Sequence, residues 1–192
     1  MSQNLEKELG PLASLVGTWE GMKGIDRAPS DEPKTLLQEK TSKYRERLQF
    51  EPTGRVDNHS QILYGLRYST AAWRLDQPDP FHEELGYWLW DAENEQVMRC
   101  FMVPRGVTVI AGGTVQADAT EFKLQAESGS NTYGICSNQF LDKEFKTVRY
   151  DLKINIHDHE SFSYHEDTQL LIKNKKDIFH HTDENTLNKV SK

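Results

Sequence analysis

Polar and apolar side chains alternate residue by residue along the stretch Asp151-Leu152-Lys153-Ile154-Asn155-Ile156-His157. The same alternation returns in Glu121-Phe122-Lys123-Leu124-Gln125-Ala126 and, with aromatic residues, in Ser161-Phe162-Ser163-Tyr164-His165. Successive side chains of a β-strand point to opposite faces, so this period predicts strands with one face buried and the other in water. Antiparallel sheets and small barrels contain such strands.

Strand-like segments of this kind recur along almost the whole chain and are separated by turn signals rich in Gly, Pro, Asn and Asp. They cover residues 17–24, 41–51, 60–75, 83–91, 95–103, 106–116, 120–127, 147–157, 161–172 and 178–189. Regularly spaced short strands predict an all-β fold, either a sandwich or a barrel. Helical patterns of about 10–15 residues do not separate these segments, which argues against parallel βαβ units.

Three segments interrupt the strand pattern. Residues 25–40 are charged and carry two prolines, and residues 128–146 are rich in Gly, Ser and Asn, so we predict a long loop in each. Before the first strand, leucines recur at helical spacing around Gly10-Pro11, and these are Leu5, Leu9, Leu12 and Leu15. This spacing predicts a short helix that plugs one end of a barrel, within a single domain over residues 1–192.

Composition narrows the class of protein. With 192 residues, 36% of them hydrophobic and 10% aromatic, the chain is long and apolar enough for one globular domain. Its net charge of -7 repels phosphate backbones and anionic lipid, so we expect neither nucleic acid nor membrane as a partner. The first residues show no signal-peptide pattern, so we expect a cytoplasmic protein with Cys100 and Cys136 reduced.

The familiar catalytic motifs do not occur in the sequence. His82-Glu83-Glu84 lacks a second histidine four residues on, so it is not a zinc-protease motif. Neighbouring strand residues face opposite sides, which prevents Glu83 and Glu84 from acting as a carboxylate pair. A nucleophile elbow and a glycine-rich phosphate loop are also missing, and we therefore predict no catalytic residue.

The segment Pro11-Leu12-Ala13-Ser14-Leu15-Val16-Gly17-Thr18-Trp19-Glu20-Gly21 resembles the opening of the nitrobindin family. Gly17, Trp19 and Gly21 match the family's G-x-W-x-G-x-G run, whereas Lys23 replaces its last glycine. Shorter similarities follow along the chain at Tyr44 with Glu46, and in the segments 82–88, 104–113 and 147–150. Nitrobindins are heme-binding barrels of roughly ten antiparallel strands, similar in shape to fatty-acid-binding proteins and lipocalins. The resemblance therefore implies a closed, FABP-like barrel.

In nitrobindins a histidine at the start of the last strand is the fifth ligand of the heme iron, and the matching segment here is 177–187. Side chains of a strand alternate between its two faces, so if Leu187 points inward, His181 also points inward and His180 points outward. A one-residue bulge between them would reverse this and turn His180 inward. The resemblance thus implies heme b bound through His181 or His180. It also implies Thr35 and Arg149 as further cofactor contacts, and nitric oxide binding or peroxynitrite isomerisation as the activity.

Two other functions stay open from the residues alone. An inward arginine could anchor the carboxylate of a fatty acid or another small hydrophobic ligand, and this would make the protein a non-enzymatic carrier. The arginines in or beside strands are Arg67, Arg99, Arg105 and Arg149. A barrel filled by its own side chains would instead serve as an interaction module. The sequence leaves a homodimer equally open.

Overall fold

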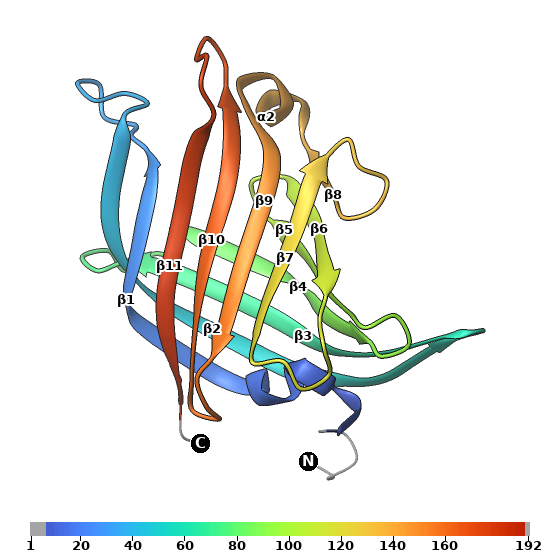
Figure 1. The fold of residues 1–192 in the computed structure, drawn as a ribbon. Helices are drawn as coiled ribbons and strands as arrows, with labels where there is room; N and C mark the ends of the chain where they lie inside the picture. The colour runs from blue at the N-terminus through green and yellow to red at the C-terminus, as the bar shows by residue number, and fades with distance from the viewer. Residues whose placement is uncertain (1–6, 191–192) are drawn as a thin grey trace.

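The computed structural model describes residues 7–190 as eleven strands with two short helices (Figure 1). The helices are the 3-10 helix η1 (Gly10–Leu15) and the α-helix α2 (Gln139–Glu144). The strands are β1 (Gly17–Pro29), β2 (Glu39–Asn58), β3 (Gln61–Arg74), β4 (His82–Asp91), β5 (Gln96–Val103), β6 (Val107–Thr114), β7 (Glu121–Ser128), β8 (Gly134–Ser137), β9 (Phe145–Ile156), β10 (Ser161–Ile172) and β11 (Phe179–Lys189).

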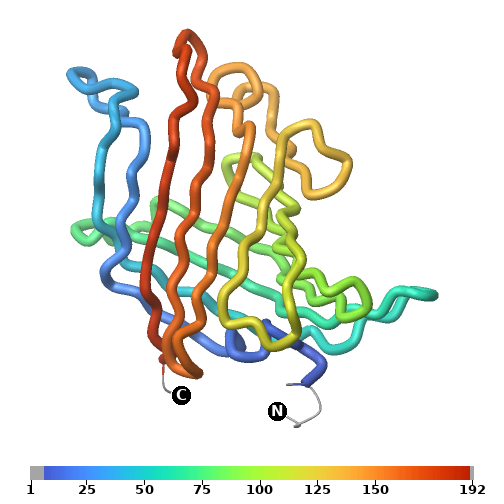
Figure 2. Tube along the Cα trace, in the orientation of Figure 1, coloured from blue at the N-terminus to red at the C-terminus, as the bar shows by residue number. Residues whose placement is uncertain are grey.

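The strands form one closed barrel in the order β1-β11-β10-β9-β7-β8-β6-β5-β4-β3-β2. Closure comes from β1, which pairs antiparallel with β2 on one side and with β11 on the other. In Figures 1 and 2 the strands β9, β10 and β11 run upright, and β3, β4 and β5 cross behind them. The prediction of an all-β closed barrel is confirmed, and a closed sheet leaves no unpaired edge.

The short helix predicted before the first strand is present as η1. Its buried face consists of Pro11, Leu12 and Leu15, and Leu5 lies outside the described residues. The indole Nε1 of Trp19 donates to the carbonyl oxygen of Leu15 at 2.7 Å, which ties the helix to β1. Gly10 packs so closely on Trp90 that a Cβ would lie 2.5 Å from the indole nitrogen. The helix therefore covers one end of the barrel as a packed part of the core.

The two predicted long loops are largely structured. Residues 25–29 belong to β1, and the connection to β2 is only 30–38. Hydrophobic alternation missed this part of β1 because its buried residue is a carboxylate, Asp26. The second segment, 128–146, contains β8 and α2, and the Asn138 side chain caps α2 by accepting from the Leu141 N–H at 3.0 Å.

A third difference concerns the gap between the predicted strands 41–51 and 60–75, which begins with Pro52, Thr53 and Gly54. There the β2–β3 ladder continues past a register shift between Pro52 and Gly54, so the proline and glycine form a bulge and the turn comes later. This makes β2 and β3 longer than predicted, and Figure 1 shows their hairpin extending beyond the barrel wall.

Aromatic side chains fill the end of the barrel next to η1. Phe162 packs edge-on against Trp19 at a ring-centroid distance of 4.9 Å, and Trp88 packs edge-on against both Phe50 at 5.9 Å and Tyr68 at 6.3 Å. Edge-to-face pairs of this kind stabilise a core beyond the area that they bury. The packed aromatic layer leaves a cavity toward the opposite end of the barrel.

Within residues 7–190, no helix is long and apolar enough to cross a membrane.

Candidate functional site

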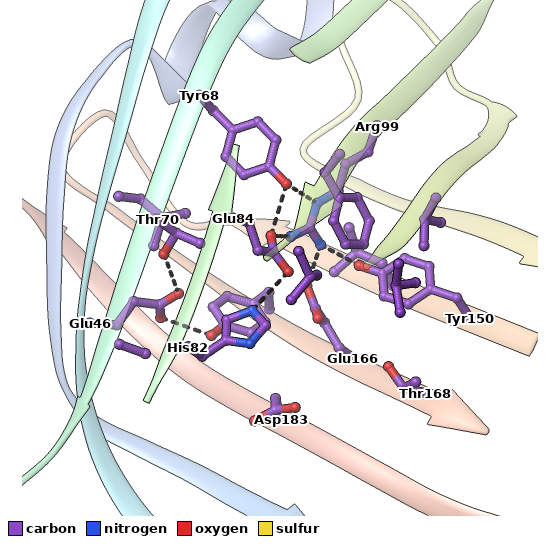
Figure 3. A pocket seen from close by; sticks show the side chains of 18 of the residues that line it. Glu46, Tyr68, Thr70, His82, Glu84, Arg99, Tyr150, Glu166, Thr168 and Asp183 are labelled. Atoms are coloured by element: carbon purple, nitrogen blue, oxygen red, sulfur yellow. Dashed lines mark hydrogen bonds and ion pairs between the residues drawn. The ribbon is translucent and has the colours of Figure 1, made fainter. Parts of the chain in front are cut away.

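The cavity has a volume of about 230 Å³, and its lining is mostly apolar with a group of charged side chains on one wall (Figure 3). Its apolar wall comes from β5, β6, β9, β10 and α2 and includes Phe101, Val103, Val107, Leu141, Phe145 and Leu170. Its charged wall comes from β2, β4, β5, β10 and β11 and includes Glu46, His82, Glu84, Arg99, Glu166, His181 and Asp183. Charged groups are rarely buried without partners, so the partners of these groups define what the site can do.

Arg99 on β5 is the centre of a buried hydrogen-bond network. Its guanidinium donates to Glu84 at 2.5 Å, to the Tyr68 hydroxyl at 3.3 Å, and to both Glu166 and the Tyr150 hydroxyl. Tyr68 in turn donates to Glu84 at 2.8 Å. Burial alone would raise the pKa of Glu84, but the charge of Arg99, together with the contacts to His82 and Tyr68, outweighs it and lowers that pKa to about 2. Arg99 is therefore already neutralised by two carboxylates of its own protein.

A second buried carboxylate, Glu46 on β2, has only neutral donors. Its oxygens accept from the Tyr164 hydroxyl at 2.8 Å, from Asn185 Nδ2 at 3.1 Å and from Thr70 Oγ1 at 3.2 Å. Burial raises the pKa of Glu46 to about 7, because these hydrogen bonds do not fully replace water around the charge. Glu46 is therefore a buried acid that exchanges its proton near neutral pH.

His82 lies at the start of β4, between the Arg99 network and the mouth. Its Nε2 lies 3.0 Å from Oε1 of Glu84. Burial would lower the pKa of His82, but the hydrogen bond to Glu84 and the charge of that carboxylate raise it to about 9. The imidazole is therefore held as a cation at neutral pH.

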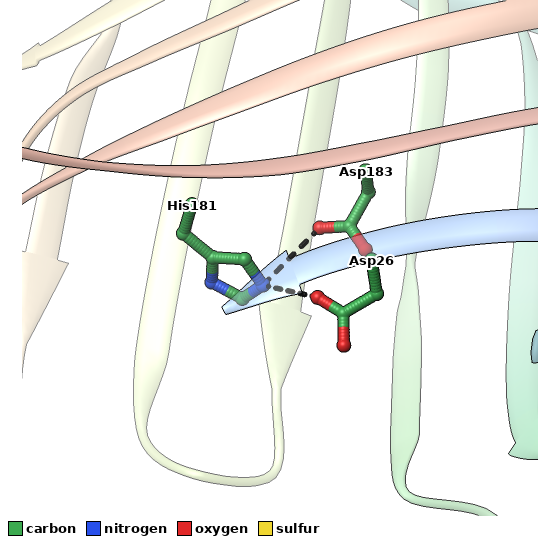
Figure 4. A group of neighbouring side chains, drawn as sticks. All are labelled: Asp26, His181 and Asp183. Atoms are coloured by element: carbon green, nitrogen blue, oxygen red, sulfur yellow. Dashed lines mark hydrogen bonds and ion pairs between the residues drawn. The ribbon is translucent and has the colours of Figure 1, made fainter. Parts of the chain in front are cut away.

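His181 on β11 meets two carboxylates, one from β1 and one from its own strand (Figure 4). Its Nε2 lies 3.0 Å from Oδ1 of Asp26 and 3.4 Å from Oδ2 of Asp183. Asp26 and Asp183 are direct partners in the β1–β11 ladder, which places both carboxylates beside the imidazole. Asp26 is almost completely buried, and its other oxygen accepts from the Arg74 guanidinium.

The protonation of this group follows from its partners. Burial lowers the pKa of His181, but the hydrogen bond to Asp26 and the charges of both aspartates outweigh it, so the pKa is raised overall. Burial raises the pKa of Asp183 to about 7, with Asp26 and Glu166 adding to the effect of burial. Burial would also raise the pKa of Asp26, but His181 and Arg74 outweigh it, so the pKa of that carboxyl is lowered and Asp183 is the acid of the group that exchanges its proton near neutral pH.

The structure places the two predicted histidines on opposite faces of β11. The β10–β11 ladder runs from Ser161 opposite Asn188 to Leu170 opposite Phe179 without a register shift, so no bulge changes the parity. His181 therefore lies on the same face as the fully buried Leu187 and lines the cavity. His180 points outward, and its Nδ1 lies 2.7 Å from Asp167.

Thr35 and Arg149 do not line the cavity. Thr35 lies in the connection between β1 and β2, where its hydroxyl is 2.8 Å from that of Ser30. Arg149 lies on the outer face of β9 and donates to Asp151 and Gln125. The expectation that these two residues contact a cofactor inside the barrel thus finds no support in their positions.

Several cavity residues were not singled out as site residues by sequence reasoning. His82 and Glu84 lie an even number of residues from the buried Trp88 and Trp90 on β4. Because side chains of a strand alternate between its faces, this spacing alone places both of them inward. Asp26 gave no comparable signal, because its partner His181 is 155 residues away along the chain. Only the closure of the barrel by β1 and β11 brings the two together.

Comparison with known proteins gives one family and several solved structures of similar fold. Residues 8–189 match the family model described as "THAP4-like, heme-binding beta-barrel domain". The crystal structure of Rv2717c from M. tuberculosis superposes with a TM-score of 0.64 at 20% sequence identity, covering 96% of this chain and 98% of that one. At that identity the likeness shows a shared fold. No curated protein matches the sequence of this chain.

Proposed function

The chain belongs to the THAP4-like, heme-binding β-barrel domain family, the nitrobindin family, and from that membership we propose that it binds heme b in its cavity through His181. The observation that carries the proposal is the position of His181, an imidazole on a rigid strand that faces an otherwise partly apolar cavity. Globins and peroxidases also hold heme iron through a histidine, and His181 would be the residue that holds it here.

The side chains of the cavity suit such a group chemically. Phe145, Leu141 and Leu170 provide an apolar wall of the kind that a porphyrin face requires. Arg105 lines the cavity at the rim and is suited to meet a propionate carboxylate. When bound, heme supplies an iron with a coordination position for a small diatomic ligand.

The role of the protein in this proposal rests on its own residues. His181 must present a deprotonated ring nitrogen to a metal, so it must give up the proton that it shares with Asp26 and Asp183. Nitric oxide as the small ligand, and isomerisation of peroxynitrite as an activity, are the finer parts of the proposal. They rest on the resemblance of the Gly17-x-Trp19-x-Gly21 motif to that of nitrobindins.

A hemin titration followed by visible absorption tests the proposal. We expect a saturable, sharpened Soret band with the unaltered chain and with His180→Ala, whose imidazole lies on the outer face. We expect His181→Ala to lose the histidine-ligated spectrum and to bind hemin at least about 10-fold more weakly. Equal spectra and affinities for the two variants would remove His181 as the ligand.

The alternative of a fatty-acid carrier is less well supported by the geometry. It requires an inward arginine that is free to bind a carboxylate, and Arg99 is the inward arginine deep in the cavity. Its guanidinium already contacts Glu84 and Glu166, so a fatty-acid carboxylate would have to displace one of them.

A further inference from the structure

We propose that Asp26, His181 and Asp183 form a binding site for a divalent transition-metal cation such as Zn²⁺ at the mouth of the cavity (Figure 4). This proposal goes beyond heme binding, because it needs no porphyrin and uses two aspartates as ligands. It shares only the imidazole of His181 with that proposal.

The spacing of the three ligand atoms is the first reason. Oδ1 of Asp26, Nε2 of His181 and Oδ2 of Asp183 all lie within 4.8 Å of one another. Nitrogen and oxygen ligands about 2.1 Å from a metal lie about 3.0 Å apart in octahedral and about 3.4 Å apart in tetrahedral coordination. The Nε2 atom lies 3.0 Å from one carboxylate oxygen and 3.4 Å from the other. A cation can therefore replace the shared proton with little movement of the side chains.

The second reason is that the three groups are held in place by the barrel. Asp26 and Asp183 sit opposite each other in the β1–β11 ladder, and His181 is two residues from Asp183 on the same face. The Arg74 guanidinium binds the other oxygen of Asp26 and fixes the direction in which Oδ1 points. Outer partners of this kind orient metal ligands and contribute to affinity.

The three groups lie in surroundings rich in carboxylates. Glu166 sits opposite Asp183 in the β10–β11 ladder and also lines the cavity, so a cation bound here would lie near a third carboxylate. His181 and Asp183 also line the cavity, so water in the cavity could fill the remaining coordination positions.

The ligand set indicates the class of metal. An imidazole with two carboxylates suits Zn²⁺, Mn²⁺ or Fe²⁺, whereas Ca²⁺ and Mg²⁺ prefer sites made of oxygen ligands only. Three protein ligands with further positions open to water is the pattern of an exchangeable or catalytic site, and structural zinc sites are closed by four.

Isothermal titration of the heme-free full chain with zinc chloride tests the proposal. We expect one site per chain, with affinity reduced at least about 10-fold in His181→Ala and in Asp183→Asn. The matched control is His180→Ala, which removes the neighbouring imidazole from the outer face and should change the affinity by less than about twofold. Repeating the titration with calcium chloride should give no comparable binding.

Asp183→Asn keeps the size of the side chain, so it tests the site even if loss of His181 disturbs the strand. Thermal unfolding of each variant identifies any that does not fold. Zinc binding that is equal in the unaltered chain, Asp183→Asn and His181→Ala would overturn the proposal, as would absence of saturable binding. Neither result would bear on hemin binding, which is measured in the absence of zinc, so the two proposals fail independently.

Discussion

The guanidinium of Arg99 lies inside the barrel within hydrogen-bonding distance of two glutamates and two tyrosines. The arginine and Glu84 are each 5% exposed, so little solvent screens their interaction. Desolvation of three charges is costly, and the network is stable because each carboxylate also has its arginine partner. The same residue keeps Glu84 ionised and so controls the charge of His82 beside it.

Removal of Arg99 should therefore destabilise the fold strongly. We expect Arg99→Met to lower the free energy of unfolding by about 3–5 kcal/mol, because it removes the guanidinium that Glu84 and Glu166 share and leaves Glu84 with His82 as its cation. Urea unfolding measures this change. Arg67→Met is the control, since Arg67 pairs with Glu51 on the outer surface, where water screens the pair, and it should change the free energy of unfolding far less. Similar losses in the two variants would mean that the interior network does not stabilise the barrel.

At the scale of the element, η1 closes the barrel by packing rather than by helix propensity. It has only six residues, too few for an isolated helix to form, and its apolar face lies against the aromatic layer of the core. The side chains of Leu9 and Leu12 are fully buried.

Shortening Leu12 tests this role of η1. We expect Leu12→Ala to lower the free energy of unfolding by about 2–5 kcal/mol, because it leaves a hole between η1 and the strands. Leu85→Ala is the matched control, since Leu85 is 67% exposed on the outside of β4 and should cost less than about 0.5 kcal/mol. Chemical denaturation of both variants measures the difference, and a small loss for Leu12→Ala would show that η1 is only loosely attached.

The sequence predicted a strand well where the inward side chains of that strand are apolar, and poorly where they are charged or where the strand is very short. Strands whose inward residues are apolar, such as β7 and β9, follow from alternation alone. The end of β1 did not, because Asp26 takes an inward position that a hydrophobic pattern cannot recognise. The short β8 has four residues, too few for any period to be visible, and it pairs with β6 and β7 only in the folded barrel.

At the scale of the whole molecule, the site exists because the barrel closes. Glu46, Glu84 and Glu166 lie on β2, β4 and β10, and they share one cavity only through strand order. The alternation of side chains along the last strand could place His181 inward. It could not show that Asp26 lies beside His181, because that contact forms only where β1 pairs with β11. The candidate ligand was thus predictable from the sequence, whereas the charged surroundings that set its protonation depend on tertiary structure.

These buried groups should make stability depend on pH in a defined direction. The pKa of Glu46 is raised from 4.5 to about 7, so its contribution is fully present below pH 4.5 and is lost as the pH rises through 7. The pKa of His82 is raised from 6.5 to about 9, so its contribution is lost as the pH rises through 9. The pKa of Glu84 is lowered from 4.5 to about 2, so its contribution to stability is present above pH 4.5 and is lost as the pH falls toward 2. Stability should therefore be greatest near pH 5 and fall on both sides.

Glu46→Gln isolates one of these contributions, because it cannot ionise. Between pH 5 and pH 9 we expect the unaltered chain to lose about 3 kcal/mol more unfolding free energy than this variant, as the shift in the pKa of Glu46 requires. Urea unfolding at pH 5, 7 and 9 measures the slope, which does not depend on how well the amide fits at any single pH. Glu51→Gln, on the outer face of the same strand, serves as the control and should change the unfolding free energy by less than about 1 kcal/mol at each pH. If Glu46→Gln keeps the full pH dependence of the unaltered chain, Glu46 is ionised throughout this range, and its carboxylate would add a permanent negative charge to those of Glu84 and Glu166 in the cavity.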